Sequence, residues 1–239
     1  MKDKHHIPRQ AKQHVPLLQS NAFRWKASRT GNLSYLLYLP KGYRAQGRKR
    51  WPLMLFLHGS GERGTDLQRV AVHGPLKHVN QGKYFPFIIV APQCPAGQSW
   101  ENDRLVRLLN HCLTRYPMDR NRIYLTGISM GGFGAWNLAV AHPERFAAVV
   151  PVCGGGDMLS VLLADSAQAA EFKRLPVWAF HGGRDPVVPP TESQRMLTAL
   201  KQRGARHLKL TIFPEVGHNA WDKAYNNPKL YAWLLRQAR

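Results

Sequence analysis

The hydrophobic residues of this 239-residue chain gather into short runs that polar segments separate. Several runs are apolar at every position rather than at alternate positions, which is typical of parallel strands covered on both faces. The runs of strand length cover residues 33–40, 52–58, 85–92, 122–128, 146–152, 175–181 and 207–213.

Between these runs, apolar residues recur at the spacing of amphipathic helices. In the segment 101–116, Leu105, Leu109 and Cys112 share one helical face, and Pro117 ends the pattern. Further helices are predicted at 191–203 and 228–237, with a shorter one near 158–170. A strand followed by a helix, repeated along the chain, predicts an α/β fold with a doubly wound, mostly parallel sheet.

Length and pattern together predict the domain organisation. Because α/β domains of this size are commonly single units, residues 26–239 are predicted to form one domain. Residues 1–25 are predicted to be a basic peripheral arm. Only about 22 residues separate the runs 146–152 and 175–181, which is too few for a large lid domain.

A serine lies in the motif G-I-S-M-G, residues 127–131, between a predicted strand and a predicted helix. The pattern G-x-S-x-G in this context is typical of a nucleophile elbow, a tight turn that exposes the serine hydroxyl. Side chains at positions 127 and 131 are expected to collide with the reversing backbone. Ser129 is therefore the candidate nucleophile.

A serine hydroxyl needs a base, usually a histidine that a carboxylate holds in place. In folds with this elbow the chain order is serine, acid, histidine. Asp185 and His218 follow predicted strands in that order, in loops at the carboxyl ends of the strands, where such sheets place their chemistry. These two residues are the candidate acid and base.

The sequence leaves alternatives for both partners. Asp157 and Glu215 also lie in loops after predicted strands, and a simple turn before Pro186 is another use for the preferred acid. His181 ends a strand, and His207 begins one at the wrong end of the sheet. We prefer the acid and base named above.

Acyl transfer also needs hydrogen-bond donors for the oxyanion. One is expected to be the backbone N–H of Met130, the residue after the nucleophile. The second is expected from the loop after the run 52–58, where we assign Ser60, with Gly59 and Gly61 as alternatives. Four residues in loops beside these segments are candidates for substrate binding, although each can equally be packing: His73, Gln93, Trp100 and Trp221.

Together, the segments HGSGERG, APQCPAGQSW, GISMGGFGAW, HGGRDPVVP and GHNAWDKAY resemble the α/β-hydrolases of the esterase, dienelactone-hydrolase and predicted serine-peptidase group. The resemblance covers nearly everything from about residue 33 onward. It implies the α/β-hydrolase fold and a serine hydrolase that cleaves small-molecule esters or acyl substrates through an acyl-enzyme intermediate. A serine peptidase acting on small peptides is the alternative. Neither reading calls for a cofactor or a metal.

Charge adds a second kind of hypothesis. The chain carries 34 Lys and Arg against 14 Asp and Glu, a formal net charge of +20, and residues 1–50 hold twelve of these cations and one acid. The second hypothesis is that the chain has a hydrolase scaffold but is not catalytic and associates with polyanions. No zinc-finger spacing, recognition-helix pattern or aromatic platform predicts specific nucleic-acid binding.

The remaining expectations concern location. Cys94, Cys112 and Cys153 show no CxxC spacing and are predicted to be reduced and buried in a cytoplasmic protein. No export signal is predicted at the N-terminus, and no apolar stretch reaches 18 residues, so no membrane insertion is expected. The oligomeric state is not predicted.

Overall fold

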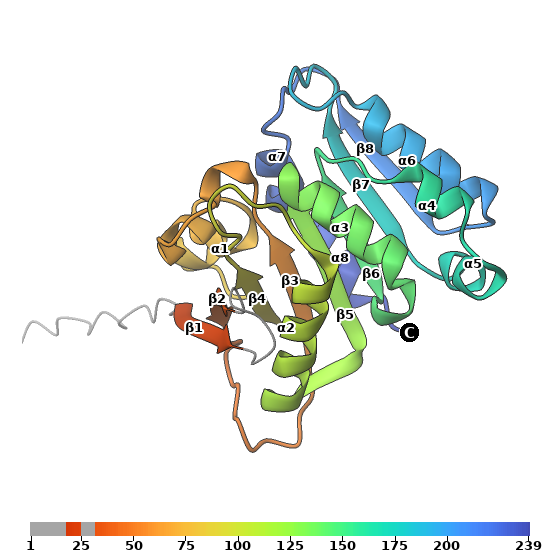
Figure 1. Ribbon diagram of the computed structural model, residues 1–239. Coiled ribbons are helices and arrows are strands. Elements are labelled where there is room, and N and C mark those ends of the chain that lie inside the picture. The colour runs from red at the N-terminus through yellow and green to blue at the C-terminus, as the bar shows by residue number, and fades with distance from the viewer. Residues whose placement is uncertain (1–17, 25–31) are drawn as a thin grey trace, which may run out of the picture.

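A single eight-stranded sheet runs through the computed structural model, which describes residues 18–24 and 32–239 (Figure 1). The strands are β1 (Leu18–Arg24), β2 (Asn32–Tyr38), β3 (Trp51–Leu57), β4 (Ile88–Pro92), β5 (Met118–Ile128), β6 (Ala148–Val152), β7 (Val177–Gly182) and β8 (Leu208–Phe213). Their order in the sheet is β1-β2-β4-β3-β5-β6-β7-β8. Strands β3 to β8 are parallel, whereas β2 pairs with β1 and β4 in antiparallel register. The predicted fold class is confirmed.

Helices alternate with the strands along the chain. They are α1 (Gly74–Asn80), α2 (Asn102–Arg115), α3 (Met130–Ala141), α4 (Met158–Leu162), α5 (Ser166–Phe172), α6 (Thr191–Gln202), α7 (Trp221–Asn226) and α8 (Pro228–Leu235), with short 3₁₀ turns η1 (Ser60–Glu62), η2 (Leu67–Ala71) and η3 (Pro143–Arg145). The predicted helices at 101–116, 191–203 and 228–237 are confirmed to within two residues. The single helix predicted near 158–170 is two helices, because Asp165 caps a new start by accepting the N–H of Gln168.

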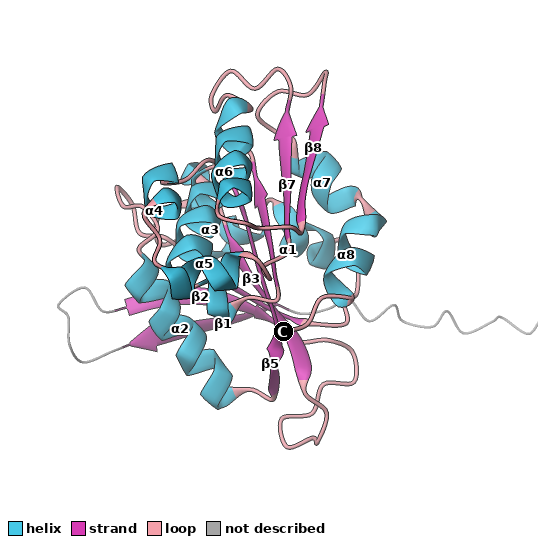
Figure 2. Cartoon of the chain, turned by 90° about the vertical axis from the view of Figure 1, so that its right-hand side faces the viewer, coloured by secondary structure: helices cyan, strands magenta, loops and turns pink. Residues whose placement is uncertain are grey.

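The helices cover both faces of the sheet, so the central strands are buried on both sides. In Figure 2, α2 to α6 lie on one side of the sheet and α7 and α8 on the other. Successive residues of β3 alternate between the two cores: Leu53 and Leu55 pack on one side, Met54 and Phe56 on the other. This double burial explains why the run is apolar at every position.

Strand β1 was not predicted from the sequence. Its two large apolar residues, Leu18 and Phe23, point to opposite faces, so the strand shows no alternating pattern. As an edge strand it pairs with β2 alone. The sheet therefore begins inside the segment assigned to the basic arm, and residues 1–17 of that arm lie outside the described residues.

No domain-sized insertion covers the carboxyl ends of the strands. The connection from β6 to β7 contains only α4 and α5, so the predicted absence of a large lid is confirmed. Within the described ranges, none of the helices has the length and apolar character needed to cross a membrane.

Candidate active site

Ser129 lies in a strained turn between β5 and α3. Its backbone φ is 51° and its ψ is −118°, a region that few residues other than glycine adopt. A Cβ atom added at Gly127 would lie 2.2 Å from the carbonyl oxygen of Gly131, and one added at Gly131 would lie 2.0 Å from the carbonyl oxygen of Leu57. The turn therefore requires both glycines, as the motif predicted.

The Ser129 hydroxyl, the His218 imidazole and the Asp185 carboxylate form one continuous chain of hydrogen bonds. Nδ1 of His218 lies 2.8 Å from Oδ2 of Asp185, and Nε2 lies 2.8 Å from Oγ of Ser129. Because an ionised carboxylate only accepts, Nδ1 carries the proton and Nε2 accepts from the serine hydroxyl. The three residues are 56 and 33 positions apart in the sequence, and the fold brings them together.

Two neighbouring loops bring the acid and the histidine together. The N–H of Arg184, beside the acid, donates to the carbonyl of Val216 in the histidine loop over 3.0 Å. At the start of the acid loop, a Cβ atom on Gly182 would lie 2.0 Å from the carbonyl oxygen of Gly217. The glycine there lets the two backbones approach closely enough for the carboxylate to reach the imidazole.

The Asp185 carboxylate is fully buried, yet it is held in its charged form. Burial favours the neutral acid, but hydrogen bonds from the N–H of Val188, from His218 and from the N–H of Val187 outweigh it and lower the pKa of Asp185. Both backbone donors lie 2.9 Å from Oδ1, which leaves Oδ2 for the imidazole. The carboxylate is therefore fixed in orientation as well as in charge.

The alternative acids and bases have other partners. Glu215 is exposed and pairs with Arg184, and Asp157 caps α4. His181 is fully buried and bonds the Ser193 hydroxyl at 2.8 Å and the Val188 carbonyl at 2.9 Å. Nε2 of His181 also lies 3.4 Å from Oδ2 of Asp185. None of these three residues hydrogen-bonds to Ser129 or to His218, whose side chains bond to each other.

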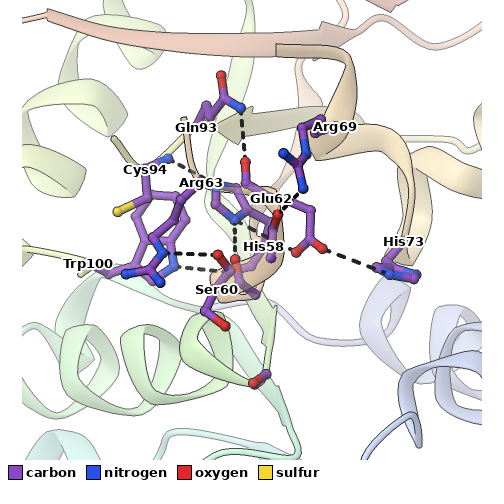
Figure 3. Close-up of polar contacts among 12 residues, drawn as sticks. His58, Ser60, Glu62, Arg63, Arg69, His73, Gln93, Cys94 and Trp100 are labelled. Atoms are coloured by element: carbon purple, nitrogen blue, oxygen red, sulfur yellow. Dashed lines mark hydrogen bonds and ion pairs between the residues drawn. The ribbon is translucent and has the colours of Figure 1, made fainter. Parts of the chain in front are cut away.

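Side chains hold the loop after β3 by its carbonyl groups. The carbonyl oxygens of residues 59–62 accept, in order, from His58 Nδ1 (2.6 Å), Arg63 Nε (2.9 Å), Arg69 Nη2 (2.6 Å) and Gln93 Nε2 (2.9 Å). Figure 3 shows these side chains gathered around the loop. Because a trans peptide points its C=O and N–H in opposite directions, the N–H groups that follow are turned away from the four side chains.

The protonation of His58 follows from its two contacts. Nε2 accepts from the backbone N–H of Cys94 over 2.9 Å, so the proton is on Nδ1 and is donated to the carbonyl of Gly59. Burial, opposed by the hydrogen bond to Gly59 and assisted by the charge of Arg63, lowers the pKa of His58 to about 4. His58 is therefore neutral near pH 7.

The loop lies directly against the candidate nucleophile. A Cβ atom added at Gly59 would lie 3.6 Å from Cβ of Ser129. The N–H of Ser60 belongs to the peptide whose carbonyl His58 holds, and the N–H of Met130 is at the first position of α3, where N–H groups have no acceptor within the helix. Their use as oxyanion donors stays a prediction.

Two of the four residues proposed for substrate binding donate hydrogen bonds to the loop after β3. Gln93 is buried and donates to the carbonyls of Glu62 and Asp66 at 2.9 and 2.7 Å. Trp100 donates from Nε1 to the carbonyl of His58 over 3.1 Å. Their direct contact with a substrate stays a prediction, and the geometry favours a supporting role.

The other two, Trp221 and His73, lie beside the candidate base. The ring of Trp221 meets the His218 imidazole edge to face, with the centroids 5.3 Å apart. The His73 ring also packs against Trp221, with the two ring centroids 5.4 Å apart. Figure 3 places His73 and Trp100 on opposite sides of Glu62.

Sequence reasoning missed a buried group beneath the acid. Cys153 directly follows β6 with a positive φ of 49°. Its sulfur lies within 4.8 Å of an imidazole nitrogen of His181 and of a carboxylate oxygen of Asp185. The carboxylate and imidazole atoms of this group already have hydrogen-bond partners. The glycines that follow at 154–156 were the only signal of a tight turn here. All three cysteines are free and buried, as predicted.

A mostly parallel sheet with a strained serine turn after its fifth strand defines an α/β-hydrolase fold. The chain belongs to the dienelactone hydrolase family, whose model matches residues 98–229. That match includes the elbow and the loops of the acid and the histidine.

Individual relatives have related descriptions. A poly(3-hydroxyalkanoate) depolymerase C of Paucimonas lemoignei is 25% identical over 142 residues, which are 52% of this chain and 32% of the relative. A putative carboxymethylenebutenolidase of Yersinia pestis is 29% identical over 110 residues, 45% of this chain and 40% of the relative. The chain thus spans less than half of either protein.

Among solved structures, a thermostable esterase matches with a TM-score of 0.74 and 31% identity. The match covers 92% of this chain and 63% of the esterase. Nearly the whole of this chain therefore shares its α/β fold with a protein that is described as an esterase.

Proposed function

We propose that this chain is a serine hydrolase that cleaves carboxylic esters of small molecules. The observation that carries the proposal is the unbroken pair of 2.8 Å contacts from Asp185 to His218 and from His218 to Ser129. In this arrangement the imidazole reaches the hydroxyl and the carboxylate at once, which the chemistry of serine activation requires.

The reaction proceeds in two halves. His218 takes the proton of the Ser129 hydroxyl as its oxygen attacks the ester carbonyl, and Asp185 stabilises the imidazolium cation that forms. The imidazolium then protonates the departing alcohol and leaves an acyl-enzyme. Water, deprotonated by the same imidazole, attacks the acyl group and releases the carboxylic acid and the serine.

The negative oxygen of each tetrahedral intermediate needs donors that are already in place. We assign the N–H groups of Met130 and Ser60 to this role. The position of Met130 at the start of α3 supports the first assignment, since the helix dipole favours negative charge there. The side chains that hold the loop carbonyls support the second.

The relatives support ester cleavage as the reaction class. The family is named for a lactone hydrolase, and a lactone is a cyclic ester. The fold neighbour with 31% identity is described as an esterase. Because esters and amides are cleaved by the same residues, the distinction between them is left to experiment.

A panel of short p-nitrophenyl esters, assayed beside aminoacyl anilides, tests the proposal. We expect turnover of the esters and a loss of about 10⁴-fold or more in kcat for Ser129→Ala. Ser34→Ala, an exposed serine on β2, is the control and keeps the wild-type rate. Ester hydrolysis at the full rate by the Ser129 variant contradicts the proposal, and anilide cleavage that exceeds ester cleavage favours a peptidase.

A further inference from the structure

The carboxylate of Glu62 is largely buried and accepts no hydrogen bond from residues 18–24 or 32–239. Its side chain is 12% exposed, and two imidazole nitrogens, Nδ1 of His58 and Nε2 of His73, each lie 3.9 Å from it. The first donates to the carbonyl of Gly59 and is not free for the carboxylate. A buried carboxylate normally accepts hydrogen bonds, so this one is a strong candidate for a ligand contact.

Glu62 lies beside the candidate nucleophile. The position of a Cβ atom on Gly59 is 3.2 Å from Oε2 of Glu62 and 3.6 Å from Cβ of Ser129, so the carboxylate and the serine flank the same glycine. On the other side, the His73 ring contacts Trp221, which contacts His218. The carboxylate thus belongs to the wall of the candidate active site.

Other polar atoms in this wall also have no partner. Nδ1 of His73 and Nε1 of Trp221 are buried and make no hydrogen bond with the described residues. Because Oε1 of Glu62 lies 3.9 Å from Nε2 of His73, we assign the imidazole proton to that nitrogen. Figure 3 marks this contact with a dashed line. An acceptor and a donor therefore stand side by side, too far apart to satisfy each other.

We propose that Glu62 and His73 form a polar subsite beside Ser129 that binds a hydroxyl group of the ester substrate, with the Trp221 ring packed against His73. The inference rests on the proposed function and adds the class of substrate to it. A hydroxyl group donates to Oε1 of Glu62 and accepts from Nε2 of His73, which matches the two groups in one contact.

A hydroxyl group fits this surrounding better than an ammonium group. Arg63 and Arg69 bind the carbonyls of Ser60 and Gly61, the two residues before Glu62, so two guanidinium charges are held on the same loop. An added ammonium group would be repelled by both guanidinium groups. The loop carbonyls of residues 59–62 already accept hydrogen bonds from side chains. A neutral hydroxyl group meets no such repulsion.

Matched pairs of esters test the subsite, because the hydroxyl group can belong to either half of the substrate. For the acyl half, p-nitrophenyl 3-hydroxybutyrate is compared with p-nitrophenyl 3-methylbutyrate. For the alcohol half, 2-hydroxyethyl butyrate is compared with propyl butyrate. In at least one pair we expect the wild-type enzyme to prefer the hydroxyl ester by about tenfold in kcat/KM, since a site that pairs a hydroxyl group discriminates against its absence.

Glu62→Gln is the test variant, with Glu144→Gln as its matched control. Glu144 also lies 3.7 Å from a histidine, His142, but on the exposed turn η3. We expect the preference to fall to within about twofold in the first variant and to persist in the second. His73→Phe, which keeps an aromatic ring against Trp221 and removes the donor, is expected to weaken the preference as well, and circular dichroism verifies that each variant folds.

Three results overturn the subsite: equal rates within both wild-type pairs, an unchanged preference in folded Glu62→Gln, or faster cleavage of 2-aminoethyl butyrate than of the hydroxyethyl ester. The esters without a hydroxyl group keep this test separate from the proposed function. If the protein hydrolyses the esters without a hydroxyl group as fast as their hydroxyl counterparts, only the subsite proposal fails. If it hydrolyses no ester and a fluorophosphonate does not label Ser129, the proposed function fails.

Discussion

The imidazole of His58 donates from Nδ1 to the carbonyl oxygen of the adjacent Gly59 over 2.6 Å. This contact fixes the peptide whose N–H belongs to Ser60, the proposed oxyanion donor. His58→Phe removes the donor and is expected to lower kcat by about tenfold or more, with a smaller change in KM, because the donor acts on the transition state. Steady-state kinetics measure the split. His78→Phe, at a buried histidine of α1, is the control, and an unchanged kcat in a folded His58 variant rules out this role.

The stability of the protein is expected to depend on pH through His58. Unfolding raises the pKa of this group from about 4 to its ordinary 6.5, so the unfolded chain binds more protons between those values. The free energy of unfolding therefore decreases as the pH falls from about 6.5 toward 4, by roughly 3 kcal/mol at most for this residue. Asp185, with its lowered pKa, adds a further loss at lower pH.

Urea unfolding at pH 7, 6 and 5 measures this dependence. Other buried histidines, including His78 and His181, share the direction of the shift, so the comparison is with His58→Asn, which keeps a donor toward Gly59 but does not titrate. We expect a shallower pH dependence in the variant. Identical slopes in the two proteins would falsify the assignment of a neutral His58.

The choice of acid is tested by Asp185→Asn. The amide cannot stabilise the imidazolium and favours the wrong tautomer of His218, so kcat is expected to fall by about 10³-fold to 10⁴-fold. Glu215→Gln and Asp157→Asn, at the two alternative acids, are expected to stay within about twofold of the wild-type kcat. A large loss in either of these variants, with a small one at Asp185, reverses the assignment.

Alanine substitutions at two glycines, one in the elbow and one in the loop after β3, are expected to differ in their effect on stability. Gly131→Ala places a methyl group 2.0 Å from the carbonyl oxygen of Leu57, so the start of α3 must move away from the end of β3 to admit it. We expect destabilisation by about 3 kcal/mol or more, or no folded protein. Gly61→Ala, where nothing lies within 4 Å of the added atom, is expected to change the melting temperature little. Similar melting temperatures for the two variants contradict the geometry.

Local sequence patterns predict much of this fold. All seven runs became strands, and four of those strands, β3, β4, β6 and β7, are buried at every position, so no alternation was needed to recognise them. The edge strand β8 is only partly buried. Strand β1 escaped prediction because its stability comes from backbone pairing with β2, a contact that leaves no trace in its side-chain pattern. The split between α4 and α5 depends on one capping aspartate.

The site was predictable where chemistry fixes the residue type. The glycines around Ser129 follow from the steric requirements of the turn, and the chain order of Ser129, Asp185 and His218 is the one that folds with this elbow use. The supporting contacts were not visible, because Gln93 and Arg69 reach the loop after β3 only through tertiary packing. For the same reason, no sequence pattern showed that the carboxylate of Glu62 is largely buried and has no hydrogen bond within the described part of the chain.

Reaction with a fluorophosphonate, read by mass spectrometry of the digested protein, tests the central claim most directly. Only a serine hydroxyl that a nearby base activates reacts quickly with this reagent. We predict a single adduct on the peptide that contains Ser129, abolished in Ser129→Ala and slowed strongly in His218→Asn. An unmodified Ser129 in a protein that still hydrolyses esters, or an adduct that forms as fast without His218, contradicts the account.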